Sequence, residues 1–267
     1  MSLLAEERKK TILDECNQFG KVKVVNLARR FQVSEETIRR DLDLLERQGK
    51  LKRVYGGAVR KSYDDGEPPY QMRQGLHSMA KQAIGQAAAQ LLKDGDTVVI
   101  DTGTTMLELA KAIQRRKRLT IITNSLPVAA VLTESLNQQR FSGSVIMLGG
   151  EVNAQQQAIS GSYSARMLEP FAVDKAFISI GGISLLGGIS DYDLNESLLS
   201  RVMIKIAKEV IVLSDHSKIG VRAFCQIASL DAVDMVICDQ PYPTSWRGEL
   251  EAKGTHWIVA EPGGGQS

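Results

Sequence analysis

The sequence predicts an α/β protein with two domains, a small one rich in helices and a larger one built on a mostly parallel sheet. Residues 1–61 contain three helix-like segments followed by a hairpin pattern. From residue 76 onward, apolar runs typical of strands alternate with helical segments. The 267 residues suffice for one small and one medium-sized hydrophobic core.

Two changes in composition predict where the domains begin and end. The segment YDDGEPPYQMRQG contains Gly66 and the pair Pro68-Pro69, which interrupt regular structure, so it is predicted to be a linker. The Gly-rich end of the chain is predicted to be a flexible tail. The expected divisions are a first domain at 1–61, a linker at 62–75, a second domain at 76–260 and a tail at 261–267.

The larger domain is predicted from seven apolar runs and the helical segments between them. Most runs are continuous in Val, Ile, Leu and Met, as expected for strands with both faces covered. Strands that alternate with helices indicate a Rossmann-like fold, in which ligands bind at the carboxyl ends of the strands. The predicted strands are Thr97–Ile100, Leu119–Thr123, Ser144–Leu148, Lys175–Ile180, Val210–Ser214, Met235–Cys238 and Trp257–Val259. The predicted helices are Ser78–Leu92, Thr105–Arg115, Pro127–Leu136 and Leu194–Ala207.

The smaller domain has the element order of a winged helix-turn-helix. Residues 4–18 form an amphipathic helix, and the short stretch Lys21–Lys23 leads into a second helix that ends near Phe31. Ser34 is placed to cap a third helix, SEETIRRDLDLLERQG. The segment KLKRVYGGAVR then has two basic arms around Gly56-Gly57, which is a hairpin signal. Three helices followed by a basic hairpin predict a winged helix-turn-helix domain.

The third helix separates an apolar stripe from a polar face when it is drawn at about 100° per residue. The stripe of Ile38, Leu42 and Leu45 is expected to be buried. The polar face is expected to enter the major groove of DNA, where arginine binds guanine edges or phosphates. The residues predicted to contact DNA, on this helix and on the wing, are Ser34, Glu36, Thr37, Arg39, Arg40, Lys52, Arg53, Tyr55 and Gly56.

A solvated helix surface is the alternative interpretation of Arg39 and Arg40, which could pair with neighbours such as Asp43. The order of helices, capped turn and hairpin favours DNA binding. The charge agrees, because residues 1–61 contain 15 Lys and Arg against 9 Asp and Glu, a net charge of +6. The rest of the chain contains 18 against 22, a net charge of −4.

Composition also predicts several absences. No stretch approaches the roughly 20 apolar residues of a membrane span, and the first ten residues, MSLLAEERKK, lack the apolar core of a signal peptide. We therefore expect a cytoplasmic protein without membrane contact. The cysteines Cys16, Cys225 and Cys238 form no CxxC pair, and the three histidines are scattered. Neither a disulfide framework, a metal site nor a cofactor is expected.

The run VSEETIRRDLDLLERQGKLKRVYGGA closely resembles the signature of the DeoR family of bacterial transcriptional regulators. Tyr55 is one departure, because many members have a histidine before the paired glycines; a tyrosine can still stack or bind a phosphate. The resemblance continues over nearly the whole chain and implies a DNA-binding regulator that is a homo-oligomer, a dimer or a tetramer.

The larger domain contains VVIDTGTTMLELA, which is similar to the Asp-x-Gly-Thr-Thr turn of the family's sensor domains. Glycine lets the backbone approach an anion, and threonine hydroxyls with helix N-terminal amides bind phosphate oxygens. Each polar turn alone could be mere capping, but three turns at one sheet edge predict an effector site. The candidate residues are Asp101, Gly103, Thr104, Thr105, Thr123, Asn124, Ser125, Gly149 and Gly150.

The resemblance further implies that Asp191, Glu196 and Lys218 line the same cavity, in a fold like that of ribose-5-phosphate isomerase. Carboxylates would accept hydrogen bonds from sugar hydroxyls, and Lys218 would offset phosphate charge. The alternatives are a polar loop for Asp191 and a surface lysine beside Asp215 for Lys218.

These observations predict a regulator, most simply a repressor of carbohydrate-metabolism genes, that binds double-stranded operator DNA and a phosphorylated sugar-like effector. One alternative is a sugar-phosphate isomerase with a DNA-binding domain, since Asp191, Asp193, Glu196 and Lys218 suit proton transfer. Another is a second domain that serves only for oligomerisation.

Overall fold

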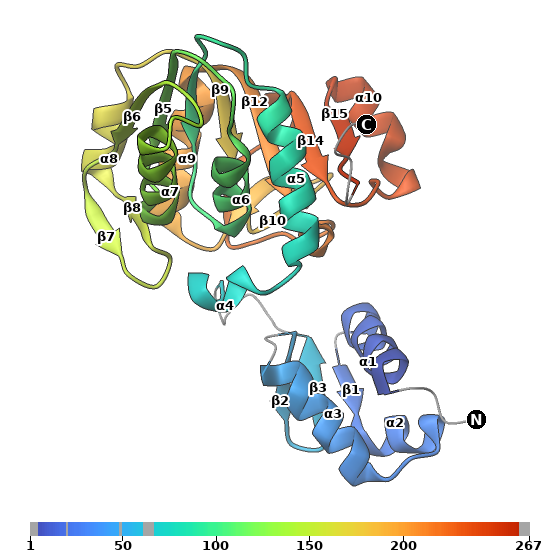
Figure 1. Ribbon diagram of the computed structural model, residues 1–267. Helices are drawn as coiled ribbons and strands as arrows, with labels where there is room; N and C mark the ends of the chain where they lie inside the picture. Colours follow the sequence, from blue (N-terminus) through green and yellow to red (C-terminus); the bar gives the residue numbers. More distant parts are fainter. Residues whose placement is uncertain (1–4, 20, 48–49, 61–66, 262–267) are drawn as a thin grey trace. The chain divides into compact units, whose positions relative to one another are not determined.

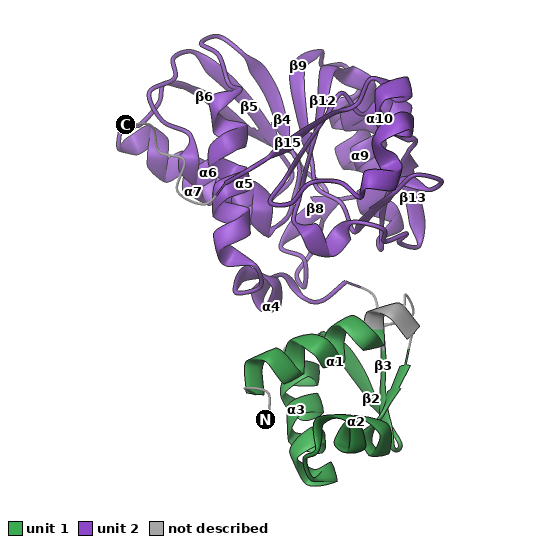
Figure 2. Ribbon diagram, turned by 90° about the vertical axis from the view of Figure 1, so that its right-hand side faces the viewer, with its two compact units in different colours: residues 1–66 green, residues 67–267 purple. Residues whose placement is uncertain are grey.

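The structure is a computed structural model that describes residues 5–19, 21–47, 50–60 and 67–261 (Figure 1). The chain divides into two compact units, residues 1–66 and 67–267 (Figure 2). The first unit is a winged helix-turn-helix, and the second is an α/β domain with a parallel sheet, so the predicted fold class is confirmed.

The described residues of the first unit form three helices and a three-stranded antiparallel sheet in the order β1-β3-β2. Strand β3 ends the hairpin and pairs with β1 and with β2, which joins the wing to the helical part. Gly57 is required there, because a Cβ atom would lie 2.0 Å from the carbonyl oxygen of Val22. The elements are α1 (Ala5–Phe19), β1 (Lys21–Lys23), α2 (Val24–Phe31), α3 (Glu35–Arg47), β2 (Leu51–Val54) and β3 (Gly57–Arg60).

The core of the first unit lies beneath α3. Ile38 and Leu42 are fully buried, and Leu45 is 1% exposed, as the apolar stripe predicted. A buried ion pair adds a polar contact, since Arg8 Nε of α1 lies 2.6 Å from Asp41 Oδ2 of α3. This pair links α1 to α3, and both side chains are largely buried, at 8% and 7% exposed.

The second unit is organised around a seven-stranded sheet in the order β15-β14-β12-β9-β4-β5-β6, with every neighbouring pair parallel. Each predicted strand lies in this sheet, with ends shifted by a few residues at most. The strands are β4 (Thr97–Ile100), β5 (Leu119–Thr123), β6 (Gly143–Met147), β9 (Val173–Ile178), β12 (Ala207–Ser214), β14 (Met235–Cys238) and β15 (His256–Val259).

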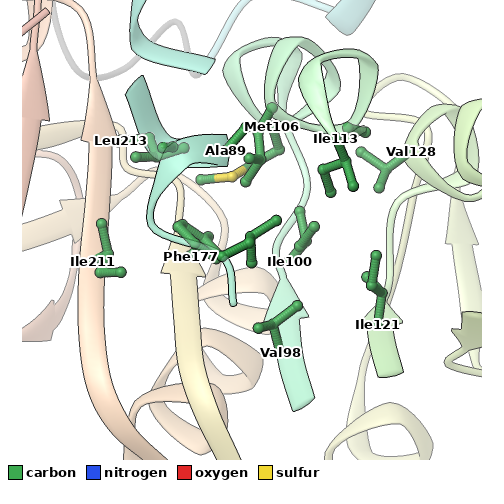
Figure 3. Packing of buried hydrophobic residues seen from close by; sticks show 14 of the residues in the cluster. Ala89, Val98, Ile100, Met106, Ile113, Ile121, Val128, Phe177, Ile211 and Leu213 are labelled. Carbon is green, nitrogen blue, oxygen red and sulfur yellow. The ribbon is translucent and has the colours of Figure 1, made fainter. Parts of the chain in front are cut away.

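Helices cover both faces of this sheet, which explains why its strands are apolar on both sides. Val98 and Ile100 pack against α5, α6 and α7, and Figure 3 shows them among the side chains of this core. Val99 points to the opposite face, which α8, α9 and α10 cover. These helices are α5 (Ser78–Gln90), α6 (Thr104–Ala112), α7 (Leu126–Asn137), α8 (Ser162–Leu168), α9 (Leu194–Ile206) and α10 (Arg247–Lys253).

Two small antiparallel sheets were not predicted. One has the order β10-β11-β13, and the other is a hairpin of β7 and β8 that projects after β6. Their strands are three or four residues long and too short for a clear pattern. They are β7 (Glu151–Asn153), β8 (Ala158–Ser160), β10 (Gly182–Ser184), β11 (Gly188–Asp191) and β13 (Cys225–Ala228).

The predicted linker, 62–75, differs from the structure in its second half, because residues 67–75 belong to the second unit. The prolines precede a short helix, α4 (Tyr70–Gln74), and proline is compatible with a helix start. Tyr70 is fully buried, and its backbone N–H donates to the carbonyl of Gln155 at 2.9 Å. The remainder of the predicted linker and the predicted tail lie outside the described residues, apart from Glu261.

Candidate functional site

The polar face of α3 is open to solvent. The Ser34 hydroxyl accepts a hydrogen bond from the backbone N–H of Thr37 at 3.1 Å and so caps the helix. The Arg40 side chain is 78% exposed, and its Nε lies 3.4 Å from Glu36. Arg39 pairs with Glu35 at 2.9 Å and is half exposed. Exposed pairs of this kind contribute about 1 kcal/mol or less, so they leave both arginines available to DNA.

Some of the wing residues predicted to contact DNA are exposed to solvent, and others are not. Tyr55 is fully exposed at the tip, beside Gly56 with φ +76°, and Lys52 is exposed. Arg53 turns the other way: its guanidinium pairs with Asp43 and donates to the carbonyl of Arg39 at 3.1 Å. Arg53 therefore links the wing to α3, and its predicted DNA contact stays a prediction.

The second site lies where the chain order of the large sheet reverses. From β4 the chain continues to β5 and β6 on one side, then returns to β9 on the other side of β4. Ligands of open α/β sheets bind in the crevice outside the strand ends at such a switch point. Asp101 follows β4 and Ser179 follows β9, so both lie at this crevice.

Asp101 forms the buried floor of the crevice. Its Oδ2 accepts hydrogen bonds from the backbone N–H and the hydroxyl of Ser179, both at 3.3 Å, and from the Ser200 hydroxyl at 3.1 Å. Burial raises the pKa of Asp101 to about 6, against the opposing effect of the hydrogen bonds from Thr102, Ser200 and Ser179. The carboxyl is therefore fixed by both β9 and α9.

Two more predicted carboxyl groups gather beside Asp101. Burial, followed by the charge of Glu67, raises the pKa of Asp191 to about 7. Burial, followed by the charges of Asp191 and Asp101, raises the pKa of Glu196 to about 9. Glu196 Oε1 is buried and has no hydrogen-bond partner among the described residues. A neutral carboxyl at pH 7 both donates and accepts hydrogen bonds, which suits a ligand rich in hydroxyl groups.

Two helix N-termini open toward the same edge of the sheet. Gly103, with φ +119°, precedes α6, and Ser125 precedes α7; within the described chain, neither helix has a side-chain cap. The buried atoms Thr102 Oγ1, Asn124 Oδ1 and Ser125 Oγ find no hydrogen-bond partner in the described parts of the chain. The hydroxyls of Thr102 and Ser125 and the N-terminal amides of α6 can donate to an anion such as phosphate, whereas Asn124 Oδ1 only accepts. At the start of α7, the Leu126 N–H already donates to the carbonyl of Gln157, and Pro127 has no N–H. The predicted residues Thr104, Thr105 and Thr123 are buried along the same turns.

Three positively charged side chains at the site come from segments that are far apart in the sequence. Lys218 lies in a short 3-10 turn, His216–Lys218, and its Nζ is 3.2 Å from Glu67 Oε1. The same oxygen lies 3.0 Å from Arg73 Nη1. Lys81 of α5 is 5% exposed and donates to the carbonyl of Arg73 at 2.7 Å. Burial lowers the pKa of Lys81 to about 8.

Glu67, Arg73 and Lys81 were missed by sequence reasoning. Glu67 and Arg73 fell in the predicted linker, and Lys81 was one polar residue of a predicted helix. The one available signal was the concentration of charge around the prolines, which composition alone cannot distinguish from a solvated segment.

Some candidate residues have packing roles in the structure. Asp193 Oδ1 accepts from the backbone N–H of Glu196 at 2.9 Å and caps α9. The predicted pair Gly149-Gly150 is exposed and lies against α8, where a Cβ on Gly150 would be 2.3 Å from Ser164 Oγ. These glycines therefore accommodate a helix, and no described contact joins them to the carboxyl groups of Asp101, Asp191 and Glu196.

The structure gives positions for residues 5–19, 21–47, 50–60 and 67–261. In that part of the chain, no three His, Cys, Asp or Glu side chains gather as metal ligands would. No helix there has the length and apolar character needed to cross a membrane.

Known proteins resemble this chain along most of its length. Residues 8–63 match the family described as DeoR-like helix-turn-helix domain, and residues 76–240 match DeoR C terminal sensor domain. The HTH-type transcriptional repressor GlcR of Bacillus subtilis (strain 168) is 34% identical over 256 residues, which are 96% of each chain. The Glycerol-3-phosphate regulon repressor of Escherichia coli (strain K12) is 32% identical over 239 residues, 90% of this chain and 92% of that protein.

Solved structures resemble it more distantly. Ribose 5-phosphate isomerase from Plasmodium falciparum has a TM-score of 0.38 and 13% identity, over 53% of this chain and 52% of that chain. The full-length Sorbitol Operon Regulator SorC from Klebsiella pneumoniae has a TM-score of 0.35 and 13% identity, over 80% of this chain and 89% of that chain.

Proposed function

The chain belongs to the DeoR family of bacterial transcriptional regulators, and from this premise we propose that it represses carbohydrate-metabolism genes under the control of a phosphorylated sugar or related metabolite. One observation carries the proposal: unpartnered buried polar groups and carboxyl groups of raised pKa meet at one edge of the sheet. The names of two relatives agree, since one is a repressor and the other regulates a glycerol-3-phosphate regulon.

The two ends of the cavity suit the two parts of such an effector. Phosphate oxygens would be bound at the N-terminus of α6 and by the Ser125 hydroxyl, with Lys218 offsetting their charge. Sugar hydroxyls would donate to Asp101 and Asp191 and share hydrogen bonds with neutral Glu196.

The exposed face of α3 would enter the major groove, with Arg40 and Arg39 contacting bases or phosphates and Tyr55 at the wing tip. Symmetric operators require two such heads, roughly 34–36 Å apart or a multiple of this distance. We therefore infer a cytoplasmic homo-oligomer, a dimer or tetramer, joined through the second unit.

A gel-shift titration with the DNA upstream of the protein's own gene tests this function. We expect specific binding that weakens when the matching phosphorylated sugar is added. The same sugar should raise the melting temperature, because ligand at 100 times its Kd adds about 2.7 kcal/mol of stability. Binding to unrelated DNA with equal affinity, and no response to any phosphorylated sugar, would contradict the proposal.

We infer that the chain is not an enzyme, although its carboxyl groups resemble those of a proton-transfer site. Of the four groups suited to isomerisation, Asp193 caps α9 and Lys218 is paired with Glu67. Incubation with pentose phosphates should therefore give no aldose–ketose interconversion. Turnover that disappears in Glu196→Gln would overturn this inference.

A further inference from the structure

We propose that Glu67 competes with the effector's phosphate for Lys218, and that its displacement signals effector binding to the chain segment leading to the DNA-binding unit. The inference rests on the proposed function, because it assigns a means of regulation to the same cavity. It is carried by the position of one carboxyl group and by the way its segment is attached.

Glu67 is buried among the charged groups of the candidate site. Its side chain is 8% exposed, and Oε1 lies 3.2 Å from Lys218 Nζ and 3.0 Å from Arg73 Nη1. Its charge also acts on Asp191 and Glu196. Glu67 therefore faces both the cavity's lysine and its carboxyl groups.

An anionic ligand and the Glu67 carboxylate would compete for the ion pair with Lys218. The ammonium group is paired with Glu67 and is also attracted by the charge of Asp215. A phosphate that attracts Lys218 weakens the ion pair between Lys218 and Glu67. The phosphate also repels the Glu67 carboxylate, because both are negatively charged and lie close together. Binding of the phosphate therefore favours a state in which Glu67 has left Lys218.

Release of Glu67 would loosen its whole segment. Pro68 and Pro69 have no backbone N–H, so this stretch depends on side chains for its attachment. Arg73 supplies much of that attachment: its Nε donates to the Pro68 carbonyl at 3.0 Å, and its Nη2 donates to Gln156 Oε1 at 2.5 Å. The carboxyl of Glu67 binds the same guanidinium, so a change at Lys218 reaches the contacts that Arg73 makes, whereas the hydrogen bond from the Tyr70 N–H to Gln155 does not depend on it.

The position of this segment in the chain allows a loss of the Glu67–Lys218 pair to affect the DNA-binding unit. Only the sequence positions 61–66 lie between the end of β3 in the first unit and Glu67. An effector controls DNA binding only if it favours one state of the protein over another. The segment that starts at Glu67 provides two such states. In one state Glu67 is paired with Lys218, and in the other it is not.

Glu67→Gln tests the competition, because glutamine retains the shape and hydrogen-bonding oxygen but removes the charge. The probes are ribose 5-phosphate, fructose 6-phosphate, glycerol 3-phosphate and inorganic phosphate, with affinity measured by calorimetry on the full chain. We expect the variant to bind the best of these probes roughly tenfold more tightly, since no charged pair must be broken. Glu169→Gln, an exposed glutamate on the same unit, is the control and should bind as the wild type does.

Amide hydrogen exchange over residues 67–75 supplies the second measurement. In the wild type and in Glu169→Gln, the bound probe should raise exchange several-fold. In Glu67→Gln, exchange should be high without probe and change little when the probe is added. If Glu67→Gln does not fold, Glu67→Asp, which withdraws the carboxyl by one methylene, should show the same trend to a smaller extent.

The two proposals fail in different ways. If none of the four probes binds the wild type, the proposed function fails, and this inference with it. If a probe binds but the Glu67 variants keep wild-type affinity and exchange, only the role of Glu67 is overturned.

Discussion

Glu196→Gln should make the second unit more stable in alkaline solution and less sensitive to pH. The carboxyl is 5% exposed, and burial with its acidic neighbours raises its pKa from 4.5 to about 9. Above pH 4.5 the unfolded chain releases this proton, whereas the folded protein keeps it. The folded state therefore loses stability as the pH rises from 4.5 toward 9.

The size of the effect follows from the width of that interval. Each pH unit within it costs about 1.4 kcal/mol, because one proton distinguishes the folded and unfolded states. Glutamine has no proton to lose, so Glu196→Gln removes this dependence. Between pH 5.5 and pH 8 the stability difference between variant and wild type should grow by about 3 kcal/mol, or about 6–12 °C in Tm.

Tryptophan fluorescence measures this unit selectively. Both tryptophans of the chain, Trp246 and Trp257, belong to the second unit, so thermal unfolding followed by their emission reports on it alone. Glu169→Gln is the control and should follow the wild type at both pH values. A Tm difference for Glu196→Gln that is the same at pH 5.5 and pH 8 would refute the reasoning.

Three further results are expected. Arg40→Ala should weaken operator binding by about 1–3 kcal/mol in gel shifts, whereas the exposed Arg247→Ala should not; equal affinities would remove Arg40 from the DNA contact. Thr104→Ala combined with Lys218→Ala should leave operator binding intact but blunt the effector response, and a full response at wild-type concentrations would show that the cavity is misplaced. Arg8→Met should destabilise the first unit by about 3–5 kcal/mol in urea unfolding followed by circular dichroism, because it leaves Asp41 buried without its partner; a loss below about 1 kcal/mol would contradict this.

The sequence predicted the large sheet well because its strands carry a strong local signal. Runs such as Thr97–Ile100 are apolar throughout, and both faces of the sheet are covered by helices. The three-residue strand β10 carries no such signal, and it is stabilised by pairing with β11. The apolar stripe of α3 was equally clear, since its period matches one buried face.

The residue pattern alone indicated the site where polar residues follow strands, and the family resemblance added Asp191, Glu196 and Lys218. Asp101 and Asn124 come directly after β4 and β5, so the strand order alone brings them together. The contact between Glu67 and Lys218 joins residues 151 positions apart, and no local pattern indicates it. The pairing of Arg53 with Asp43 was not predicted for a similar reason, because the two residues belong to different elements.

The site has a part fixed by the central sheet and a part built from surface segments, and this difference determines how such a sensor can acquire a new specificity. Asp101 is anchored by groups from the central sheet and α9, and so belongs to the rigid scaffold of the domain. A second part of the site consists of Glu67 and Arg73, which are held by hydrogen bonds to each other and to Gln156 at the tip of the β7–β8 hairpin. Changes in that part can alter which metabolite is recognised without disturbing the folding core. A library of substitutions at the hairpin tip is thus the natural starting point for engineering a biosensor from this protein.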